Sequence, residues 1–429
     1  MTDFWIVTAV LMASIIAGLP IAFAIGMTTI IYMLMTMPEN LSVIPLRMFA
    51  GIDSFILMAL PLFVLGADIM VKTGISDKLF QFVKVFVGRL QGGLAYVNVL
   101  SATIFGAISG AALSDVAALG KVNITGMVKE GYTRDFACGL TAGASVQAPL
   151  IPPSNIAVLY GGIMSLSVGT LLIAGFVPGL VLALLEVLWI FVNRKRLNMP
   201  KGRESFTLKQ KFEICQDGMV ALVMPAIILI GIVKGFFTPT EAAGVACLYA
   251  LVVGFVIWGN LRVATVIEGL LESGLVSANL FMIISFSSVF AWALGAQNVP
   301  DQIAEGLLGF THNPLLIMLI INVVLLIVGM WMETAAAIVL FAPILAPIAY
   351  RIGIDPIHFA VVMITNLTVG LITPPVGVVL YAVSAVGSES FVKVTKATLP
   401  YMVIGMLVIV VMTLFPSAAL FAPRLMGLM

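Results

Sequence analysis

The sequence has few charged residues, few histidines and few cysteines. Charged residues make up only 10% of its 429 residues, against about 25% in a soluble domain, so the composition excludes a soluble globular protein. With only two histidines, a metal or haem centre built on imidazole is not expected. Cys138, Cys215 and Cys247 have the spacing of neither a metal site nor a disulfide framework. The apolar segments also lack a nucleophile with a neighbouring base, so we expect no enzyme activity.

What the sequence does contain is long apolar runs. Hydrophobic residues make up 61% of the chain, and its mean hydropathy is +1.18. Runs of about 20 residues, enough to cross a bilayer, recur from Phe4 to Pro423. We therefore predict an all-α polytopic membrane protein, and its first run, which has no basic start or cleavage site, is expected to be a retained span. The predicted spans cover residues 4–35, 44–71, 136–163, 167–193, 218–237, 240–259, 263–296, 357–386 and 396–422.

Two further apolar stretches, 93–127 and 314–349, are interrupted at their centres by "GAISGAALSD" and "GMWMETAAA". Each half then has about 15 residues, or about 22 Å of helix, which is too short for a hydrocarbon core of about 30 Å. We predict that each stretch is a re-entrant helical hairpin that enters and leaves the membrane on one side. Amphipathic pieces at 74–90 and 298–310 precede the hairpins and are expected to lie along the membrane interface.

Two of the predicted spans contain adjacent prolines, Pro152-Pro153 and Pro374-Pro375. A proline inside a helix removes a hydrogen-bond donor and clashes with the preceding turn, at a cost of about 3 kcal/mol. A lone pair of prolines is more often a packing kink than a binding site. Two pairs at equivalent positions, each following a hairpin, instead favour helices that are broken for a function.

The order span, span, interfacial helix, hairpin, broken span, span occurs twice. Corresponding features are separated by 222 residues for the double prolines, 224 for Asp77 and Asp301, and 223 for Gly106 and Gly329. One additional span between the units reverses the second unit relative to the first, so we predict two inverted repeats. The predicted domains are a first repeat at 1–193, a basic linker with a connecting helix at 194–237, and a second repeat at 238–429.

The positive charges indicate an orientation. With the N-terminus inside, 17 of the 21 Lys and Arg residues fall in inner segments and 4 in outer ones, as the positive-inside rule requires. We therefore predict a cytoplasmic N-terminus, a periplasmic C-terminus and hairpins that open toward opposite sides.

Inverted repeats with discontinuous helices that meet near the midplane are the general plan of secondary transporters. Unpaired backbone groups survive in hydrocarbon only where protein, water or an ion covers them. Around both breaks the sequence offers small residues, hydroxyls and backbone oxygens with few formal charges. This environment suits Na⁺, whereas a proton relay needs buried acids or histidines in series.

Several residues near the breaks have two interpretations each. Ser145, Thr368 and Thr373 either coordinate a cation or donate to carbonyls of their own helices. Glu333, at the second hairpin tip, either lines a wet cavity or caps the following half-helix, and both remain open. Glu186 is expected to face a partner helix rather than a substrate.

The motif "FTPTEAAGVACLYAL" at 237–251 has a structural explanation. Thr238 is a helix N-cap, and Glu241, three residues on, completes a capping box. The motif fixes where a span begins, and we assign it no ligand.

Five stretches resemble the large membrane subunit of tripartite ATP-independent periplasmic (TRAP) transporters, which belong to the ion transporter superfamily. They extend over nearly the whole chain in the expected order: "LPLFVLGADIMVKTGISDKL", "SATIFGAISGAALSDVAALGKV", "IPPSNIAVLYG", "FTPTEAAGVACLYAL" and "ITPPVGVVLY". The first hairpin tip, "SGAAL", has fewer serines than is usual in this family, which leaves backbone carbonyls as ligands there.

The resemblance implies an elevator transporter in a bacterial inner membrane, in which a mobile domain of hairpins and broken helices carries substrate past a static scaffold. It implies Na⁺-driven import of an organic acid, such as sialic acid or a C4-dicarboxylate. The implied partners are a small four-helix membrane subunit and a periplasmic substrate-binding protein, with Na⁺ as coupling ion and no cofactor. The alternative is a stand-alone carboxylate symporter or antiporter of the same superfamily.

The resemblance also implies where the ligands bind. One Na⁺ site is expected at carbonyls and hydroxyls near Gly329, Gly370, Thr373 and Val376. By the internal repeat, the other is expected near Gly106, Ser109, Ser145, Ala148, Ile151 and Ser154. The substrate is expected between the hairpin tips, at helix N-termini and at Ser109, Gly110, Asn155, Glu333 and Thr334.

Overall fold

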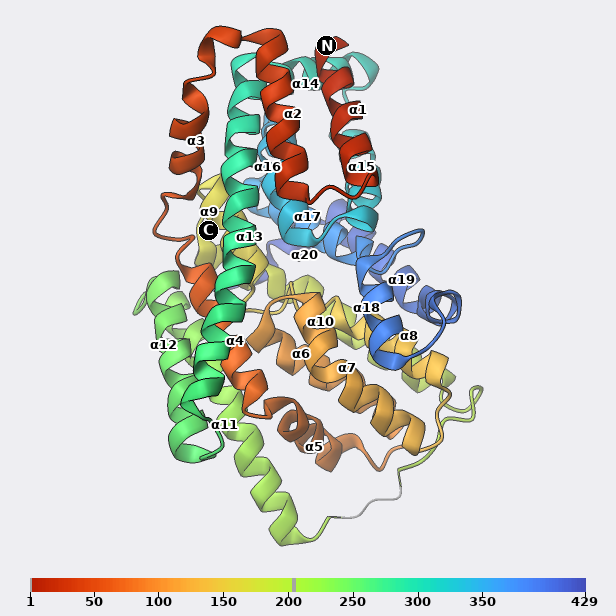
Figure 1. Ribbon diagram of the computed structural model, residues 1–429. Coiled ribbons are helices and arrows are strands. Elements are labelled where there is room, and N and C mark those ends of the chain that lie inside the picture. Colours follow the sequence, from red (N-terminus) through yellow and green to blue (C-terminus); the bar gives the residue numbers. More distant parts are fainter. Residues whose placement is uncertain (1, 203–205) are drawn as a thin grey trace.

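The computed structural model describes residues 2–202 and 206–429, which form a bundle of helices (Figure 1). Seven helices in this part of the chain are long and apolar enough to cross a membrane, or up to eight if the bent pair α4 (Ala59–Lys72) and α5 (Ile75–Val87) forms one span. The only β-type pairing among these residues is an isolated bridge between Gln91 and Lys201. The prediction of an all-α polytopic membrane protein is confirmed.

The two halves of the chain contain similar series of helices. The first half contains α1 (Thr2–Ile16), α2 (Ile21–Thr36), α3 (Val43–Ile52), α4, α5, α6 (Gly93–Ser109), α7 (Ala112–Lys129), α8 (Arg134–Ser145), α9 (Asn155–Met164) and α10 (Val168–Asn193). Helix α11 (Leu208–Val233) connects the halves. The second half contains α12 (Pro239–Val252), α13 (Val263–Ala296), α14 (Val299–Phe310), α15 (Pro314–Trp331), α16 (Thr334–Arg351), α17 (Pro356–Gly370), α18 (Val378–Gly387), α19 (Phe391–Leu414), α20 (Pro416–Ala419) and α21 (Phe421–Leu425).

The predicted single span at 4–35 is wrong, because this region forms two antiparallel helices. After α1, Gly18 adopts a φ of +85°, and Pro20 precedes α2, which runs back beside α1 (Figure 1). The chain thereby returns to the end of the molecule at which α1 started, near α14 and away from α5 (Figure 1). The prediction that the N-terminus lies in the cytoplasm, on the same side as the basic linker, assumed a single span in this region. Because the region forms a helix pair, that prediction loses its support.

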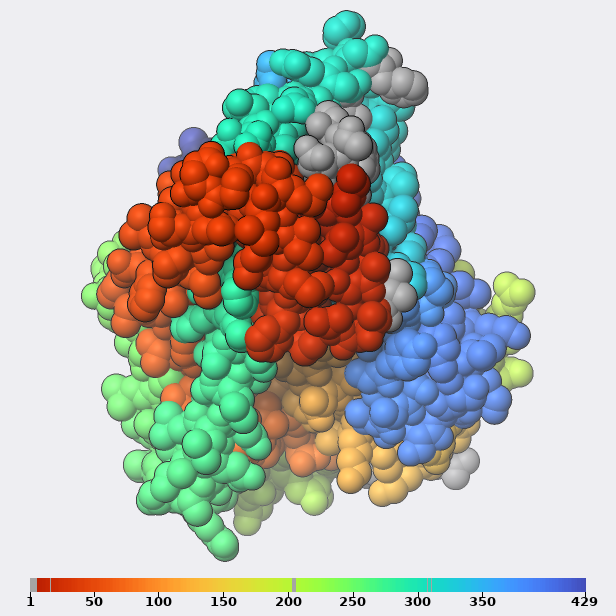
Figure 2. Space-filling model, turned by 45° about the horizontal axis from the view of Figure 1, so that its top comes forward, coloured from red at the N-terminus to blue at the C-terminus, as the bar shows by residue number. Residues whose placement is uncertain are grey.

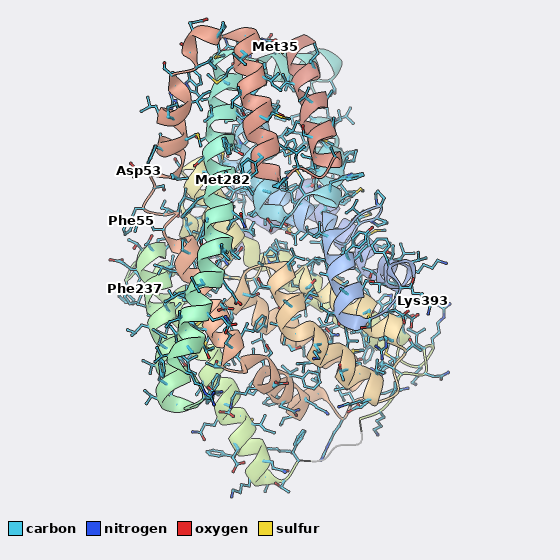
Figure 3. All side chains as sticks on the ribbon, in the orientation of Figure 1. Met35, Asp53, Phe55, Phe237, Met282 and Lys393 are labelled. Atoms are coloured by element: carbon cyan, nitrogen blue, oxygen red, sulfur yellow. The ribbon has the colours of Figure 1, made fainter. Side chains whose placement is uncertain are left out.

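The predicted span at 44–71 is interrupted as well. Helices α3 and α4 are separated by an irregular segment at 53–58. Asp53 and Phe55 of this segment lie at one edge of the molecule (Figure 3). The Thr240 hydroxyl of α12 donates to the Phe55 carbonyl at 2.6 Å, which holds the segment against the start of α12.

Side-chain caps fix the starts of several helices. The predicted capping box at α12 is confirmed, because the Thr238 N–H donates to the Glu241 carboxylate at 2.8 Å and the Glu241 N–H donates to the Thr238 hydroxyl at 3.3 Å. The Ser154 hydroxyl accepts from a backbone N–H in the first turn of α9. The Asp355 carboxylate does the same at α17. Such caps satisfy backbone donors that have no partner within the helix.

Both predicted hairpins form as helix pairs. In the first, α6 and α7 pack together and turn at Gly110, which has a φ of +63°. In the second, α15 and α16 turn at Met332 and Glu333. The arms of the second hairpin have 18 residues each, or about 27 Å, and are longer than predicted. The split of each stretch is confirmed, and re-entrant insertion stays a prediction.

Both predicted helix breaks form. Helix α8 ends at Ser145 and α9 begins at Asn155, while α17 ends at Gly370 and α18 begins at Val378. The two double prolines lie in the intervening segments, and each Pro–Pro peptide bond is cis. The breaks are therefore confirmed at the predicted positions.

The helices that lead into the breaks lie inside the molecule, and the first break segment, 146–154, is buried, whereas the second break segment exposes Pro375. Every residue of 357–370 in α17 and of 137–145 in α8 is buried. Elsewhere α4 packs against α12 and α13, and α2 and α3 lie along α13. Figure 2 shows the N-terminal helices (red) beside α13 (green), with the C-terminal helices (blue) on the other side. The outer helices expose large apolar side chains such as Leu248 and Leu275, as expected of a lipid-facing surface.

Candidate functional site

At the first break, the hairpin α6–α7 touches the segment between α8 and α9. A Cβ placed on Gly106 would lie 2.7 Å from the Ala148 Cα, so this approach requires a glycine. The Asn155 side-chain amide, at the start of α9, donates to the Ser109 carbonyl at the hairpin tip at 3.1 Å. Four of the predicted site residues are therefore brought together.

The second break makes matching contacts with the hairpin α15–α16. A Cβ placed on Gly370 would lie 2.6 Å from the Gly329 Cα. The Gly377 N–H donates to the Met330 carbonyl near the hairpin tip at 3.0 Å. The Thr373 N–H donates to the Gly370 carbonyl at 2.9 Å and closes the turn that follows α17. These contacts bring the predicted residues Gly329, Gly370 and Thr373 together.

The contacts at the two breaks occur at corresponding positions. The residues of the glycine contacts are 223 and 222 positions apart in the two halves, and those of the tip hydrogen bonds are 221 and 222 apart. These offsets match that of the double prolines. Each break is thus held against the first arm of the hairpin in its own half of the chain.

Buried amide side chains join the same elements, and the sequence analysis missed them. In the first half, the Asn98 amide of α6 donates to the Thr141 hydroxyl of α8 at 2.8 Å. In the second half, the Asn366 amide of α17 donates to the Asn322 side-chain carbonyl of α15 at 2.9 Å. A signal was present in the sequence, because Asn98 and Asn322 are 224 residues apart inside apolar helices, and the polar residues Thr141 and Asn366 are 225 apart.

The hydroxyls at the breaks donate within their own helices. Ser145 donates to the Ala142 carbonyl at 2.9 Å, Thr368 to the Ile364 carbonyl at 2.7 Å, and Thr373 to the Val369 carbonyl at 3.0 Å. The structural interpretation of these three residues is therefore confirmed. A hydroxyl that donates its hydrogen still has two lone pairs, so its oxygen keeps the capacity to bind a cation.

The remaining predicted residues lie in the break segments and at the hairpin tips. Ile151 lies between α8 and α9, where Ser154 caps α9, and the half-buried Val376 precedes α18. The hydroxyls of Ser109 and Thr334 are buried and have no hydrogen-bond partner among the described residues. The two tip hydroxyls are therefore available to a ligand.

The predicted capping role of Glu333 is confirmed, and the residue also borders a cavity. Its carboxylate accepts from the backbone N–H groups of Ala335 and Ala336 at 2.9 and 3.3 Å and so caps α16. It also lines a cavity of about 560 Å³ between the hairpin tips and the pair α4 and α13. Gly110 and Thr334 flank residues of this cavity. Its polar lining residues include Ser109 and Asn155 from the first half, Glu333 from the second, and Asp68 and Glu272 from α4 and α13.

An ion-pair cluster forms the α4–α13 wall of this cavity, and the sequence analysis did not find it. The Lys72 ammonium lies 3.0 Å from the Asp68 carboxylate and 2.6 Å from the Glu272 carboxylate. A Cβ on Gly269 would lie 2.6 Å from the Asp68 carboxylate, so the glycine makes room for the cluster. The cluster joins α4 to α13 across 200 residues of sequence, which no local spacing reveals.

The breaks offer a cation mainly backbone oxygens. In the part of the chain that the structure describes, no three His, Cys, Asp or Glu side chains are placed to hold a metal ion. The groups at each break are instead backbone carbonyls and the neighbouring hydroxyls, and some of these carbonyls, such as those of Gly106 and Gly370, already accept one hydrogen bond. Hard monovalent cations accept such neutral oxygen ligands.

Comparison with protein families matches residues 8–418 to the DctM component of tripartite ATP-independent periplasmic transporters. The chain belongs to this family. The resemblance seen in the sequence is therefore confirmed over nearly the whole chain. Family members are transporter components, which points to transport rather than to enzyme activity.

Three curated relatives have similar lengths. The sialic acid TRAP transporter large permease protein SiaM of Vibrio cholerae is 37% identical over 95% of this chain and 96% of the relative. The C4-dicarboxylate large permease protein DctM of Pseudomonas aeruginosa is 35% identical over 94% and 95% of the two chains. The 2,3-diketo-L-gulonate large permease protein YiaN of Escherichia coli is 33% identical over 95% and 96%.

Two solved structures share the fold. The Alcanivorax borkumensis YdaH transporter superposes with a TM-score of 0.58 at 15% sequence identity, over 89% of this chain and 88% of its own. Neisseria gonorrhoeae MtrF superposes with a TM-score of 0.57 at 14% identity, over 88% and 84%. At these identities the similarity concerns the fold alone.

Proposed function

We propose that the protein is the large permease of a Na⁺-coupled importer of an organic acid in a bacterial inner membrane. The observation that carries this proposal is the pair of helix breaks, each of which follows a buried helix and is held against a hairpin glycine at corresponding positions. The interruption of a helix makes backbone oxygens available to a ligand, and secondary transporters bind coupling ions at such places.

The second break is the proposed site of one Na⁺. Its ligands are oxygens of Gly329, Gly370, Thr373 and Val376, where the hairpin and the turn after α17 meet. The Gly370 carbonyl already accepts one hydrogen bond, and a carbonyl has a second lone pair for a cation. The packing of Gly370 on Gly329 supports this site because it brings the two backbones to within contact distance.

The first break is the proposed site of a second Na⁺. Its candidate ligands are oxygens of Gly106, Ser109, Ser145, Ala148, Ile151 and Ser154. The contact of Gly106 with Ala148 supports it in the same way as the glycine contact at the second break. Because the Ser109 carbonyl accepts from Asn155, this carbonyl links the ion to the start of α9.

The substrate is proposed to occupy the cavity at the hairpin tips. The buried hydroxyls of Ser109 and Thr334 have no partner among the described residues, and the Asn155 amide lines the same cavity. The N-termini of α7, α9 and α16 supply positive dipole ends for a carboxylate, with Gly110 allowing close approach at the tip of the first hairpin. Glu333 repels a carboxylate, so its proposed substrate contact is an acceptor for a hydroxyl group.

The arrangement of the helices supports an elevator mechanism built on two inverted repeats. Hairpins and broken helices pack with one another, and α4, α12 and α13 pack as a separate group whose contact with the tips lines the cavity. We propose that the first group moves past the second. The end of the molecule with α5 and the start of α11, next to the basic linker, is proposed to face the cytoplasm.

Two Na⁺ ions and one monoanion carry one net positive charge inward. Each elementary charge moved through 100 mV provides about 2.3 kcal/mol. Because about 1.36 kcal/mol corresponds to a factor of ten, the membrane potential alone supports an accumulation of about 50-fold. The Na⁺ gradient adds to this value.

The family membership favours a tripartite assembly over a stand-alone carrier. We therefore propose as partners a small membrane subunit and a periplasmic binding protein. Relatives named for sialic acid, C4-dicarboxylates and 2,3-diketo-L-gulonate share the carboxylate group. The proposed substrate class is accordingly an organic acid.

The experiment is uptake into proteoliposomes that contain this permease and its cognate small membrane subunit. A panel of carboxylates is offered with and without the cognate binding protein, under an inward Na⁺ gradient or an equal K⁺ gradient. We expect uptake only with Na⁺ and the binding protein. Uptake that is equal in K⁺ refutes the coupling, and equal uptake without the binding protein supports the stand-alone alternative.

A further inference from the structure

Glu186 is a buried carboxyl group of α10 that neither proposed ligand site uses. Its side chain is 1% exposed. One carboxylate oxygen, Oε2, accepts from the Gln147 side-chain amide at 2.7 Å. The other, Oε1, is buried without a hydrogen-bond partner among the described residues. An isolated carboxyl group in this setting is costly to ionise, and such groups in membrane helices usually have a role.

Helix α10 is shaped to lie directly on the first break. A Cβ on Gly175 would lie 2.9 Å from the Leu150 carbonyl oxygen, and a Cβ on Gly179 would lie 2.7 Å from the Ile151 side chain. Glu186 follows two turns later and reaches back to the same segment through Gln147. The break therefore rests on α10 along more than two helical turns.

Gln147 joins this helix to the hairpin. It is fully buried and lies between Ser145 and Ala148, two candidate ligands of the first Na⁺ site. Its side-chain carbonyl accepts from the Thr103 hydroxyl of α6, one turn before Gly106. The chain of hydrogen bonds thus connects α10, the break segment and the hairpin arm, and the last two supply the candidate oxygens of the site.

At the second break the positions that correspond to this chain are apolar. The residues 222 positions after Gln147 and Glu186 are Val369 and Val408, and both are buried. The residue 223 positions after Thr103 is a leucine. The second half is instead linked by Asn322, which accepts from the Asn366 amide and donates to the Thr413 hydroxyl of α19. The two breaks are therefore held by different polar contacts.

We propose that Glu186 is a positioning residue of the first Na⁺ site. Through Gln147 it fixes the backbone of the break, and its negative charge raises the affinity of this site for a cation. The nearby ionisable group is the hydroxyl of Tyr401 on α19, which supplies no positive charge at neutral pH. When Na⁺ binds at the first break, it provides the positive counter-charge for the Glu186 carboxylate. This inference rests on the proposed Na⁺ coupling. It adds that the two proposed Na⁺ sites are supported by different side chains.

The test is the Na⁺ dependence of uptake by Glu186→Gln in the complete reconstituted system. The amide keeps the shape and an acceptor for Gln147 but removes the charge. We expect the half-saturating Na⁺ concentration to rise about tenfold, which corresponds to about 1.4 kcal/mol, because the variant lacks the negative charge. The maximal rate at saturating Na⁺ should stay near that of the wild type. A loss of packing alone would instead lower the maximal rate and leave the half-saturation in place.

Two further variants complete the test. Thr103→Val removes the last hydrogen bond of the chain and should raise the half-saturating Na⁺ concentration less than Glu186→Gln does. If Glu186→Gln does not fold, the result for Thr103→Val decides whether this chain supports the Na⁺ site. Glu241→Gln, at the exposed cap of α12, is the matched control and should leave the Na⁺ dependence unchanged. Wild-type uptake that does not depend on Na⁺ overturns both the proposed coupling and the role assigned to Glu186. Na⁺-dependent wild-type uptake with unchanged half-saturation in Glu186→Gln and Thr103→Val overturns the assignment of Glu186 alone.

Discussion

Replacing Gly370 by alanine places a methyl group in the contact between the second break and its hairpin. The new Cβ would lie 2.6 Å from the Gly329 Cα, 2.7 Å from the Gly329 carbonyl carbon and 3.1 Å from its oxygen. All three are backbone atoms, so no side-chain rotation relieves the clash. To bring the closest pair to the 3.4 Å of an ordinary contact, the hairpin has to retreat by about 0.8 Å.

This displacement is large for a binding site. Ligand groups have to be held within about 0.5 Å of their productive positions, and the retreat carries the Gly329 carbonyl beyond that range. Overpacking of this kind costs about 1–3 kcal/mol. If the cost falls on the ion-bound state, the half-saturating Na⁺ concentration rises by a factor of about 5 to 150.

The assay is uptake by the reconstituted transporter as a function of Na⁺ concentration. Gly244→Ala in α12 and Gly274→Ala in α13 are matched controls, because a Cβ at either position has no neighbour within 4 Å. In a helix alanine is favoured over glycine by about 1 kcal/mol, so both controls should fold at least as well as the wild type. A folded Gly370→Ala variant with wild-type Na⁺ half-saturation would refute the assignment of this contact to a cation site.

Three further substitutions test neighbouring parts of the account. Thr373→Ala removes one proposed ligand and should raise the Na⁺ half-saturation about tenfold, and unchanged Na⁺ dependence of uptake would count against this ligand. Asn366→Leu leaves the buried Asn322 carbonyl without its donor and should destabilise the fold by about 1–3 kcal/mol; a thermal melt of the purified protein with no lower midpoint would contradict it. Glu333→Ala removes the cap of α16 and should cost about 0.5–2 kcal/mol. The same melt checks it, and Glu333→Asp, which keeps a capping side chain, should lose less.

The sequence predicted the fold best where prolines or glycines interrupt an apolar run. Both breaks were predictable from the adjacent prolines Pro152-Pro153 and Pro374-Pro375, whereas single prolines such as Pro178 lie inside continuous helices. The glycine that turns the first hairpin, Gly110, was visible in the same way. The nearly constant offset between the halves predicted which residues would meet, because equivalent positions in a repeat occupy equivalent places.

Features that depend on tertiary packing were not predictable. The division of 4–35 into two helices was signalled in the sequence by Gly18 and Pro20 but was missed, whereas the packing of α2 against α13 is visible only in the fold. A Cβ on Gly26 of α2, for example, would lie 2.8 Å from the Phe286 ring of α13. The ion-pair cluster of Lys72 and Glu272 joins residues 200 positions apart, and only the folded chain brings them together.

The proposed cation sites can be observed directly in cryo-electron microscopy maps of the transporter prepared in NaCl and in choline chloride. We predict a density feature at each break in the Na⁺ map, enclosed by hairpin and break oxygens, that is absent or weaker in choline. Maps that are identical at both breaks, or ion density that appears only elsewhere, would contradict the account.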